Sequence, residues 1–388
     1  MTPGARVQAA IEILDRVIAG EAAERALTGW ARGARYAGSK DRAAVRDHVF
    51  DALRRLRSAA WTGGLGAAPV AAMDGRAVMA GLLAGQGADL GALFDGMGHA
   101  PRPWTAPLTA EPPPEPVALD CPDWLLPRVR AALGARAAPV LAALRDRAPV
   151  VLRANAARIE RDDLAARLAL EGIEAVAHPV ASTALTVTGS ARGLVATAAF
   201  ADGLFEMQDA GSQALVERLP DMAGLRVLDL CAGGGGKALA VAARGAAEVW
   251  AHDADPARMR DLPGRAARAG AEIRLTEAPE DAAPFDLVIA DVPCSGSGSW
   301  RRAPEAKWRL TEARLAALTQ AQDAILGRAH ALVRPGGRVA YMTCSLLREE
   351  NEDRADAAIR SLAMTLEARL GLTPLEGCDG FHLSLMRR

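Results

Sequence analysis

A chain of 388 residues exceeds the size of one ordinary hydrophobic core and predicts two or three domains. Half of its residues are hydrophobic and 24% are charged, a balance that is typical of globular proteins and excludes a disordered or fibrous chain. The formal net charge of −1 excludes a uniformly basic coat for nucleic acid, but it is compatible with a local basic patch.

The sequence contains no segment of about 18 uncharged apolar residues, so we expect no membrane span. Glu12 and Asp15 stand where a signal peptide would have its apolar run, which predicts a cytoplasmic protein. The cysteines are odd in number, widely spaced and without a CxxC pair, which argues against a zinc knuckle or a disulfide framework. The five are Cys121, Cys231, Cys294, Cys344 and Cys378. We expect reduced thiols and no bound metal.

Residues 1–120 are predicted to form a helical domain that ends in a proline-rich linker at residues 101–116. Apolar residues recur at helical spacing in two runs, Val7, Ile11, Leu14 and Ile18, and then Val45, Val49, Leu53 and Leu56. Residues 1–60 carry eleven basic residues against seven acidic ones. The arginines of the second run form either a solvated helix face or a patch that contacts phosphates: Arg42, Arg46, Arg54, Arg55 and Arg57.

Residues 121–212 are expected to form a small α+β domain. Strands are predicted at VVLRAN, IEAVAHP and ALTVTG, and a helix at RDDLAARLALEG, which ends at Gly172. Over residues 213–388, short apolar strands alternate with helical stretches, which predicts a doubly wound, mainly parallel α/β sheet. Ligands of such sheets bind at the carboxyl ends of the strands, and the chemically suggestive residues of this domain lie there.

A glycine-rich loop follows the first of these strands. Gly233-x-Gly235-x-x-Ala238, with Asp253 about twenty residues later, matches a nucleotide-binding pattern, since glycines admit a ligand close to the backbone and the acid can bind ribose hydroxyls. A phosphate-binding P-loop is excluded because Cys231 replaces its first glycine and Ala238 replaces its Ser or Thr. The loop alone leaves a dinucleotide and S-adenosylmethionine as alternatives.

Two cysteines decide between these cofactors. Cys294 follows one apolar strand beside Asp291, and Cys344 ends another strand about fifty residues later. One such cysteine is more often a small buried residue, but two at equivalent strand ends favour a reactive pair. A thiolate is the nucleophile that adds to carbon 6 of a pyrimidine, after which carbon 5 can accept a methyl group. The neighbouring carboxyl group can stabilise the charge that develops at ring nitrogen 3.

Several sequence blocks resemble the Sun-type RNA cytosine-5 methyltransferases, and the bacterial RsmB branch fits best. The blocks are DLCAGGGGK, DVPCSGSGSWRRAPEAKW, TCSLLREENE, the closing DGFHLSLMRR, and more weakly QDAGSQ and GSKDRAAVRDHVFDALRRLR. The resemblance covers nearly the whole chain. It implies an all-α NusB-like RNA-binding domain over 1–120, a small α+β linking domain over 121–212 and a Rossmann-like S-adenosylmethionine-dependent methyltransferase domain over 213–388.

The resemblance also assigns roles to residues. It implies Cys344 as the nucleophile, Cys294 as the thiol that assists product release and Asp291 at the target base. S-adenosylmethionine is expected along the glycine loop, with Asp253 on the ribose and Glu277, where an aspartate is usual, near the adenine. The implied cofactor-binding residues are Cys231, Ala232, Gly233, Gly234, Gly235, Gly236, Lys237, Asp253, Glu277 and Asp291. The family usually has Ala-Pro where this chain has Gly233-Gly234.

Only three of the 46 basic residues are lysines, and two of them, Lys237 and Lys307, fall inside the resembling blocks. Because lysine is so rare in this arginine-rich chain, its presence at these two positions predicts that function requires both side chains. Arg301, Arg302, Lys307 and Trp308 are expected to form an RNA-facing loop, with an ordinary charged surface as the alternative.

These observations predict a monomeric enzyme that uses S-adenosylmethionine to methylate carbon 5 of a cytosine in small-subunit (16S) ribosomal RNA through a covalent cysteine–RNA adduct. One alternative is a nicotinamide-dependent oxidoreductase, which would not need two cysteines. The other is a non-catalytic RNA-binding factor for ribosome assembly, and the intact set of Asp291, Cys294 and Cys344 argues against it.

Overall fold

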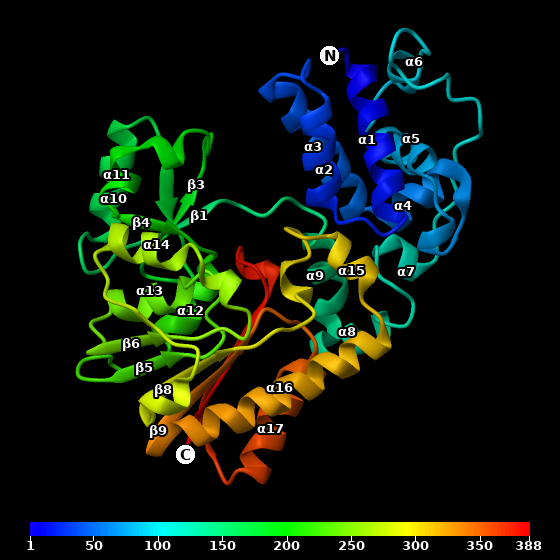
Figure 1. Ribbon diagram of the computed structural model, residues 1–388. Helices are drawn as coiled ribbons and strands as arrows, with labels where there is room; N and C mark the ends of the chain where they lie inside the picture. Colours follow the sequence, from blue (N-terminus) through cyan, green and yellow to red (C-terminus); the bar gives the residue numbers. More distant parts are fainter. The chain divides into compact units, whose positions relative to one another are not determined.

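The computed structural model describes residues 1–388, which divide into two compact units (Figure 1). The first unit contains Met1–Arg147 and the distant segment Trp300–Leu310; the second contains Ala148–Ser299 and Thr311–Arg388. Residues 121–147 therefore group with the N-terminal helices. The finer division into three domains stays a prediction. None of the helices is both long enough and apolar enough to cross a membrane.

The first unit is entirely helical. Its longer helices are α1 (Pro3–Ile18), α2 (Ala23–Gly33), α3 (Ser39–Arg54) and α5 (Gly75–Gly85); shorter ones are α4 (Leu56–Ala60), α6 (Leu90–Leu93), α7 (Glu115–Ala118), α8 (Leu126–Leu133), α9 (Ala137–Ala143) and α15 (Glu305–Arg309). Helix α1 begins as its sequence predicts, because the Thr2 hydroxyl accepts the Ala5 N–H and Pro3 occupies the first turn. Both predicted apolar runs are buried in one core, apart from the half-buried Ile18.

The second unit opens with a small four-stranded antiparallel sheet of order β2-β3-β1-β4. Its strands are β1 (Val151–Ala154), β2 (Ala175–Ala177), β3 (Ala184–Val187) and β4 (Phe205–Met207), and its helices are α10 (Arg161–Leu170), α11 (Ala198–Ala201) and α12 (Ala210–Glu217). The predicted strands and helix are confirmed. Strand β4 was not predicted, although it pairs directly with β1.

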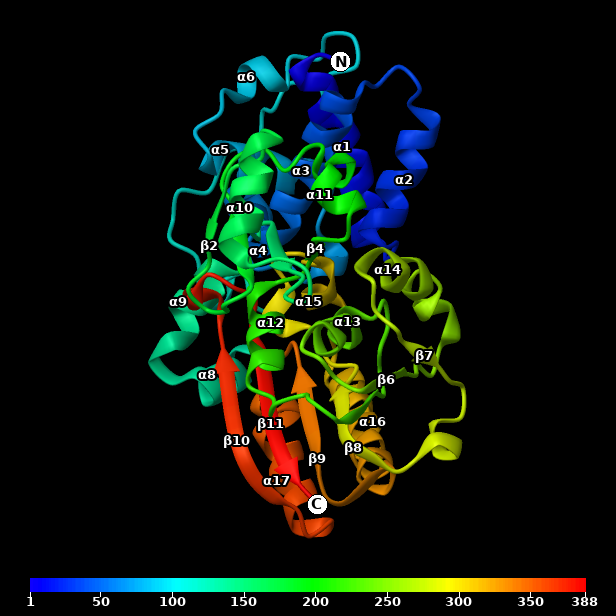
Figure 2. The same ribbon diagram turned by 90° about the vertical axis from the view of Figure 1, so that its left-hand side faces the viewer.

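The rest of the second unit is a seven-stranded sheet of order β10-β11-β9-β8-β5-β6-β7, and Figure 2 shows β10, β11, β9 and β8 side by side. The strands are β5 (Arg226–Asp229), β6 (Glu248–Ala251), β7 (Arg274–Leu275), β8 (Phe285–Asp291), β9 (Val333–Thr343), β10 (Thr365–Leu372) and β11 (Phe381–Arg387). The strands from β9 to β7 run parallel, as predicted, and β11 is antiparallel to its neighbours β9 and β10.

Helices cover both faces of this sheet. Helices α12 and α13 (Gly236–Ala243) contact one face, and α16 (Glu312–Leu332) and α17 (Glu352–Ser361) contact the other, while α14 (Leu262–Ala269) follows β6 (Figure 1). Each face has its own buried core. The carboxyl ends of β5, β8 and β9 therefore meet at one edge, because neighbouring parallel strands end on the same side.

Candidate functional site

The glycine loop joins β5 to α13 with a backbone that requires glycine. Gly233 and Gly235 have φ angles of 50° and 79°, in the left-handed region that side chains disfavour. A Cβ on Gly235 would lie 2.1 Å from Leu262 Cδ1 of α14. The loop therefore turns tightly against its neighbour and leads directly into the first turn of α13, whose leading N–H groups are suited to an anionic ligand.

Asp253, predicted to bind a ribose, lies directly beside this loop and is 3% exposed. Its Oδ2 accepts the N–H of Gly233 at 2.9 Å, and its Oδ1 accepts the N–H of Asp255 at 3.0 Å. Arg258 forms an ion pair with it at 3.2 Å. Asp253 therefore fixes the entry of the glycine loop, in addition to the role predicted for it.

Three charged groups meet at the strand ends. Lys237, from the first turn of α13, binds Asp291 at the end of β8 with Nζ 2.5 Å from Oδ2. Burial disfavours the charge on Lys237, but the ion pair outweighs it and raises the lysine pKa. Asp229, at the end of β5, is 1% exposed, and burial together with the charge of Asp291 raises its pKa to about 7. The structure thus holds an excess of acid around one buried lysine.

Asp229 also has an unused acceptor. Its Oδ2 accepts the N–H of Ala238 at 3.1 Å, whereas its buried Oδ1 has no hydrogen-bond partner within the protein. A buried carboxylate oxygen without a donor is costly, so this position suits a ligand that carries a cation or an N–H group. The glycine loop beside Asp229 supplies hydrogen-bond donors, its backbone N–H groups. A ligand that carries both an ammonium group and a carboxylate would therefore bind Asp229 with the first and the loop with the second.

The two cysteines of the predicted pair are adjacent. Cys294 Sγ and Cys344 Sγ lie 3.4 Å apart, in the turns that follow β8 and β9. The hydrogen bond between the sulfurs holds the pKa of Cys344 below its ordinary value, and the charge of Lys237 and a hydrogen bond from Ser299 act in the same direction. The same sulfur contact raises the pKa of Cys294 well above its ordinary value. Cys344 is therefore favoured as the thiolate and Cys294 as the protonated donor.

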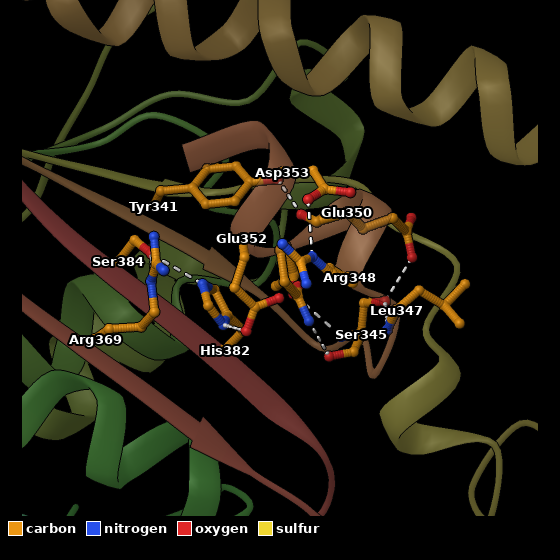
Figure 3. A network of polar contacts seen from close by, with 12 residues as sticks. Tyr341, Ser345, Leu347, Arg348, Glu350, Glu352, Asp353, Arg369, His382 and Ser384 are labelled. Atoms are coloured by element: carbon orange, nitrogen blue, oxygen red, sulfur yellow. Dashed lines mark hydrogen bonds and ion pairs between the residues drawn. The ribbon is translucent and has the colours of Figure 1, made fainter. Parts of the chain in front are cut away.

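A buried carboxylate that sequence analysis assigned no role holds this pair. Glu350 is fully buried, and one oxygen accepts the Ser295 N–H at 2.8 Å while the other accepts both the Ser295 and Ser345 hydroxyls at 2.5 Å. Gln322 donates a further hydrogen bond to it at 3.2 Å. Figure 3 shows Ser345 approaching this carboxylate, while the Tyr341 hydroxyl donates to the Glu350 backbone carbonyl.

Ser295 directly follows Cys294, and Ser345 directly follows Cys344, so one carboxylate ties together the residues after both thiols. Glu350 lies in the quoted block TCSLLREENE, and an acid placed a few residues after a strand-end cysteine was the available signal. The sequence could not show that the same acid also reaches the other cysteine turn.

Residues 218–382 match the family model described as 16S rRNA methyltransferase RsmB/F, and residues 121–192 match the model for its ferredoxin-like domain. The chain is 34% identical over 290 residues to ribosomal RNA small subunit methyltransferase B of Klebsiella pneumoniae, covering 69% of this chain and 66% of that protein. The chain belongs to the RsmB/F family.

A second relative, ribosomal RNA small subunit methyltransferase B of Xanthomonas campestris, is 32% identical over 288 residues, covering 68% of this chain and 66% of that protein. The matched part thus spans just under two thirds of the length of these curated relatives. Membership of the RsmB/F family confirms the predicted family and the predicted cofactor, S-adenosylmethionine.

Solved structures support the fold of this RsmB/F-family chain. The crystal structure of PH0851 has a TM-score of 0.78 at 22% identity and covers 100% of this chain and 99% of that chain. A methyltransferase homolog from Pyrococcus horikoshii has a TM-score of 0.63 at 24% identity, covering 70% and 97%. NSun6 from the same organism, with SFG, has a TM-score of 0.59 at 19% identity, covering 69% and 98%. The predicted α/β fold class is confirmed, and the NusB-like identity of the helical domain stays a prediction.

Three other predicted cofactor residues of this RsmB/F-family member have different surroundings. Cys231 is half-buried in the loop, and burial raises the pKa of its thiol to about 12, so it is protonated. The neighbouring Ala232 donates its N–H to the His252 carbonyl at 2.9 Å, which joins the loop to β6. Glu277 follows β7 and is exposed, so its predicted approach to the adenine stays a prediction.

The predicted RNA-facing loop of this RsmB/F-family chain is largely buried in the structure. Arg301 and Lys307 are 5% and 2% exposed, and of the four predicted residues only Arg302 is exposed. The Trp308 indole donates to the Leu53 carbonyl at 2.7 Å and packs on the helical core. Burial lowers the pKa of Lys307 to about 8 against the attraction of Asp120. The prediction placed these side chains outward, because sequence alone did not show that they complete the helical unit.

The arginines of α3 and α4, for which a solvated face and a phosphate patch were the alternatives, are partly buried. Arg54 and Arg57 are each 7% exposed, and they bind the carbonyls of Arg301 and Cys121 at 2.8 and 2.6 Å. Arg46 is exposed but pairs with Glu24 at 2.6 Å. These arginines are mostly used inside the helical unit, because they satisfy backbone carbonyls that helix ends and loops leave unpaired.

Proposed function

We propose that this RsmB/F-family protein methylates carbon 5 of a cytosine in small-subunit ribosomal RNA, with S-adenosylmethionine as the methyl donor. The observation that carries the proposal is the pair of sulfurs, Cys294 and Cys344, 3.4 Å apart beside the Lys237–Asp291 ion pair. Methyl transfer to an already nucleophilic atom needs no thiol, and hydride transfer to nicotinamide needs none either. A carbon that must first be activated by covalent addition does need one.

The cofactor fits the residues present. Asp229 Oδ1 is a buried acceptor without a donor, and it would hold the ammonium group of S-adenosylmethionine. The N–H groups of the glycine loop would hold its carboxylate, and Asp253 lies beside the loop, where ribose hydroxyls would come. When bound, S-adenosylmethionine supplies the methyl group.

In the first step the Cys344 thiolate attacks carbon 6 of the cytosine and forms the S–C6 bond, so the electron pair of the 5,6 double bond becomes available at carbon 5. The lowered pKa of Cys344 favours the thiolate form that makes this attack. Asp291 would hydrogen-bond ring nitrogen 3, which takes a proton through Asp291 from the Lys237 ammonium during addition and returns it during elimination.

In the second step carbon 5 takes the methyl group, loses its proton to a base, and the S–C6 bond breaks to restore the ring and the Cys344 thiolate. Cys294 Sγ lies 3.4 Å from Cys344 Sγ, beside the adduct. Its raised pKa keeps the thiol protonated beforehand, so Cys294 first releases its own proton to solvent and its thiolate, a strong base, then takes the proton from carbon 5. We assign Cys294 to this elimination. Addition needs a thiolate aimed at the ring face, whereas elimination needs only a group that moves a proton near carbon 5.

Substitution of each cysteine tests the assignment. Cys344→Ala should abolish methylation and leave no covalent protein–RNA species, because no adduct can form. Cys294→Ala should still allow attack, so a methylated adduct should accumulate and survive denaturing electrophoresis. Cys121→Ala, a buried thiol in the helical unit, is the matched control and should retain methylation. A trapped species with Cys344→Ala and none with Cys294→Ala would reverse the two roles.

We also propose that the helical unit and the small α+β layer present the RNA, and that the protein acts in the cytoplasm as a monomer. Mapping 5-methylcytosine in 16S ribosomal RNA from cells with and without this chain tests the substrate. One position should lose its methyl group when the chain is absent. If every position kept its methyl group, the proposed substrate would be wrong even if S-adenosylmethionine bound.

A further inference from the structure

Two arginines outside the predicted site bind backbone carbonyls of the glycine loop. Arg153, on β1 of the small sheet, is 5% exposed and donates from Nη1 to the Gly236 carbonyl at 2.6 Å and to Gln208 Oε1 at 2.5 Å. Arg265, on α14, donates to the Gly234 carbonyl. Guanidinium groups therefore donate hydrogen bonds to the backbone carbonyls of two of the four consecutive glycines.

A single carboxylate connects the two arginines. Glu206, on β4, lies directly opposite Arg153 in the antiparallel pairing of β1 and β4, and it is 6% exposed. It accepts Arg265 Nη2 at 2.8 Å and also binds Arg268. Burial lowers the pKa of Arg153 to about 10, while the charge of Glu206 opposes this effect. The small sheet thus holds one buried cation and one buried anion, both directed to the cofactor loop or to its neighbour α14.

The loop has a physical need for such support. Four consecutive glycines have more backbone freedom in the absence of contacts than any other sequence of that length, so fixing one conformation is entropically costly. A peptide unit is planar, so holding the Gly236 carbonyl also fixes the direction of the Lys237 N–H at the first turn of α13. That turn is where the cofactor carboxylate is expected.

We propose that Arg153 and Arg265 are positioning residues for the cofactor loop, and that the small α+β layer is thereby a working part of the S-adenosylmethionine site. From the sequence, this layer was expected to link the other two domains. The inference concerns cofactor binding in the absence of RNA, so it stands or falls separately from the choice of cytosine, or of any other base, as the methyl acceptor.

The first experiment compares Arg265→Gln with Arg268→Gln in the full chain. Arg265 donates two hydrogen bonds to Glu206 and Arg268 donates one, and Arg268 also lies over the Phe200 ring at 4.0 Å. Only Arg265 contacts the loop. Calorimetric titration with S-adenosylmethionine should show a dissociation constant raised about tenfold for Arg265→Gln and less than about twofold for Arg268→Gln. Arg265→Lys, which keeps a donor, should recover part of the loss.

Three further measurements separate positioning from general stability. Arg265→Gln should raise the KM for S-adenosylmethionine and leave kcat at saturating cofactor nearly unchanged, because the reacting groups are untouched. Amide hydrogen exchange at residues 233–237 should become faster in this variant and not in Arg268→Gln. Arg153→Gln should behave like Arg265→Gln if the variant folds. If it does not fold, the comparison of Arg265→Gln with Arg268→Gln decides the question. Equal affinities for wild type and Arg265→Gln, or equal losses in both glutamine variants, would overturn the proposal.

Discussion

The two halves of the block DVPCSGSGSWRRAPEAKW follow one another in sequence and belong to different units. In Asp291–Ser299 the polar groups are tied to the other strand ends: the Gly298 N–H donates to the Cys344 carbonyl at 2.9 Å, and the Ser297 hydroxyl accepts the Leu346 N–H at 2.7 Å. In Trp300–Leu310 they are tied to the helical unit, through Trp308 to Leu53.

Residues of one sequence block can therefore serve different units of the molecule. A resemblance assigns the block as a whole to one family, but burial and partners assign the job of each residue. The first half carries groups that chemistry needs at the carboxyl edge of the sheet. The second half carries a buried lysine whose ammonium lies over the rings of two tryptophans, and one of these, Trp308, packs on the helical core. It was the half expected to meet RNA.

The largest expected effect comes from removing the tryptophan anchor of the second half. Trp308→Ala deletes a ring packed on the helical core and the hydrogen bond to the Leu53 carbonyl, so the free energy of unfolding should fall by about 3 kcal/mol. Denaturant unfolding of the full chain measures this. Trp124→Ala, whose ring has Arg128 5.6 Å from its centre, serves as a comparison in the same unit. An unchanged stability for Trp308→Ala would mean that the segment is not anchored as described.

In the first half, the largest effect should come from the carboxylate that ties the cysteine turns. Glu350→Gln replaces an acceptor of four hydrogen bonds by an amide whose NH2 faces donors, so the two turns should shift. We expect kcat to fall about 10- to 30-fold, because small misplacements of reacting groups are costly. The dissociation constant for S-adenosylmethionine should stay the same.

Asp353→Asn is the control for this variant, since Asp353 pairs with Arg348 on the surface and does not reach either cysteine turn. Wild-type kcat in Glu350→Gln would show that the serines hold the turns without the acid. A parallel loss of cofactor affinity would show instead that the variant has disturbed the whole strand edge.

The buried lysine of the second half predicts a dependence of stability on pH. Its pKa is about 8 in the folded chain, below its ordinary value, so the unfolded chain binds more protons than the folded one from about pH 8 to about pH 10. The free energy of unfolding should therefore gain about 1 to 2 kcal/mol from this group as the pH rises through that window.

Lys307→Met fills a similar volume without a titrating group, so its unfolding free energy should lack this rise between pH 8 and pH 10. Denaturant unfolding at four or five pH values, on both proteins, gives the comparison. Identical slopes for the two proteins would mean that Lys307 titrates as an exposed lysine does.

The smallest expected effect concerns which cations of the helical unit remain for RNA. Arg32 at the end of α2, Arg35 in the loop that follows it and Lys40 in the first turn of α3 are exposed, in contrast to the buried Arg54 and Arg57. Replacing all three by alanine should weaken RNA binding about threefold to tenfold at moderate salt and reduce the salt dependence by about two counterions. Arg46→Ala, which removes a cation already paired with Glu24, is the control. Equal salt slopes for the triple variant and wild type would place the RNA elsewhere.

The sequence predicted the helices, the parallel sheet and the strand-end residues, because each of these depends on the order of residues near one another in the chain. Apolar spacing found α1 and α3, the alternation of strands and helices found the parallel sheet, and strand-end chemistry found the two cysteines and Asp291. Each helix, strand or strand-end residue was identified from a window of about twenty residues, where helix and strand periodicity act.

The contacts that sequence analysis missed join residues far apart in the chain. Arg153 binds a carbonyl 83 residues later, and Arg54 binds one 247 residues later. An arginine carries no local sign of whether it will face solvent or a buried carbonyl, because the partner is a backbone group that any residue could supply. The same limit explains why Lys307 was expected outside and is found inside.

The placement of Trp300–Leu310 also sets an order of events during synthesis. The ribosome makes residues 1–147 long before residues 300–310, so the nascent helical unit must wait, with the site for Trp308 uncovered, while more than 150 further residues emerge. An exposed apolar surface on a waiting chain is a site for chaperones or for misassembly. The helical unit therefore completes its core only after most of the second unit has been synthesised, so the last folding steps of the two units take place at about the same time.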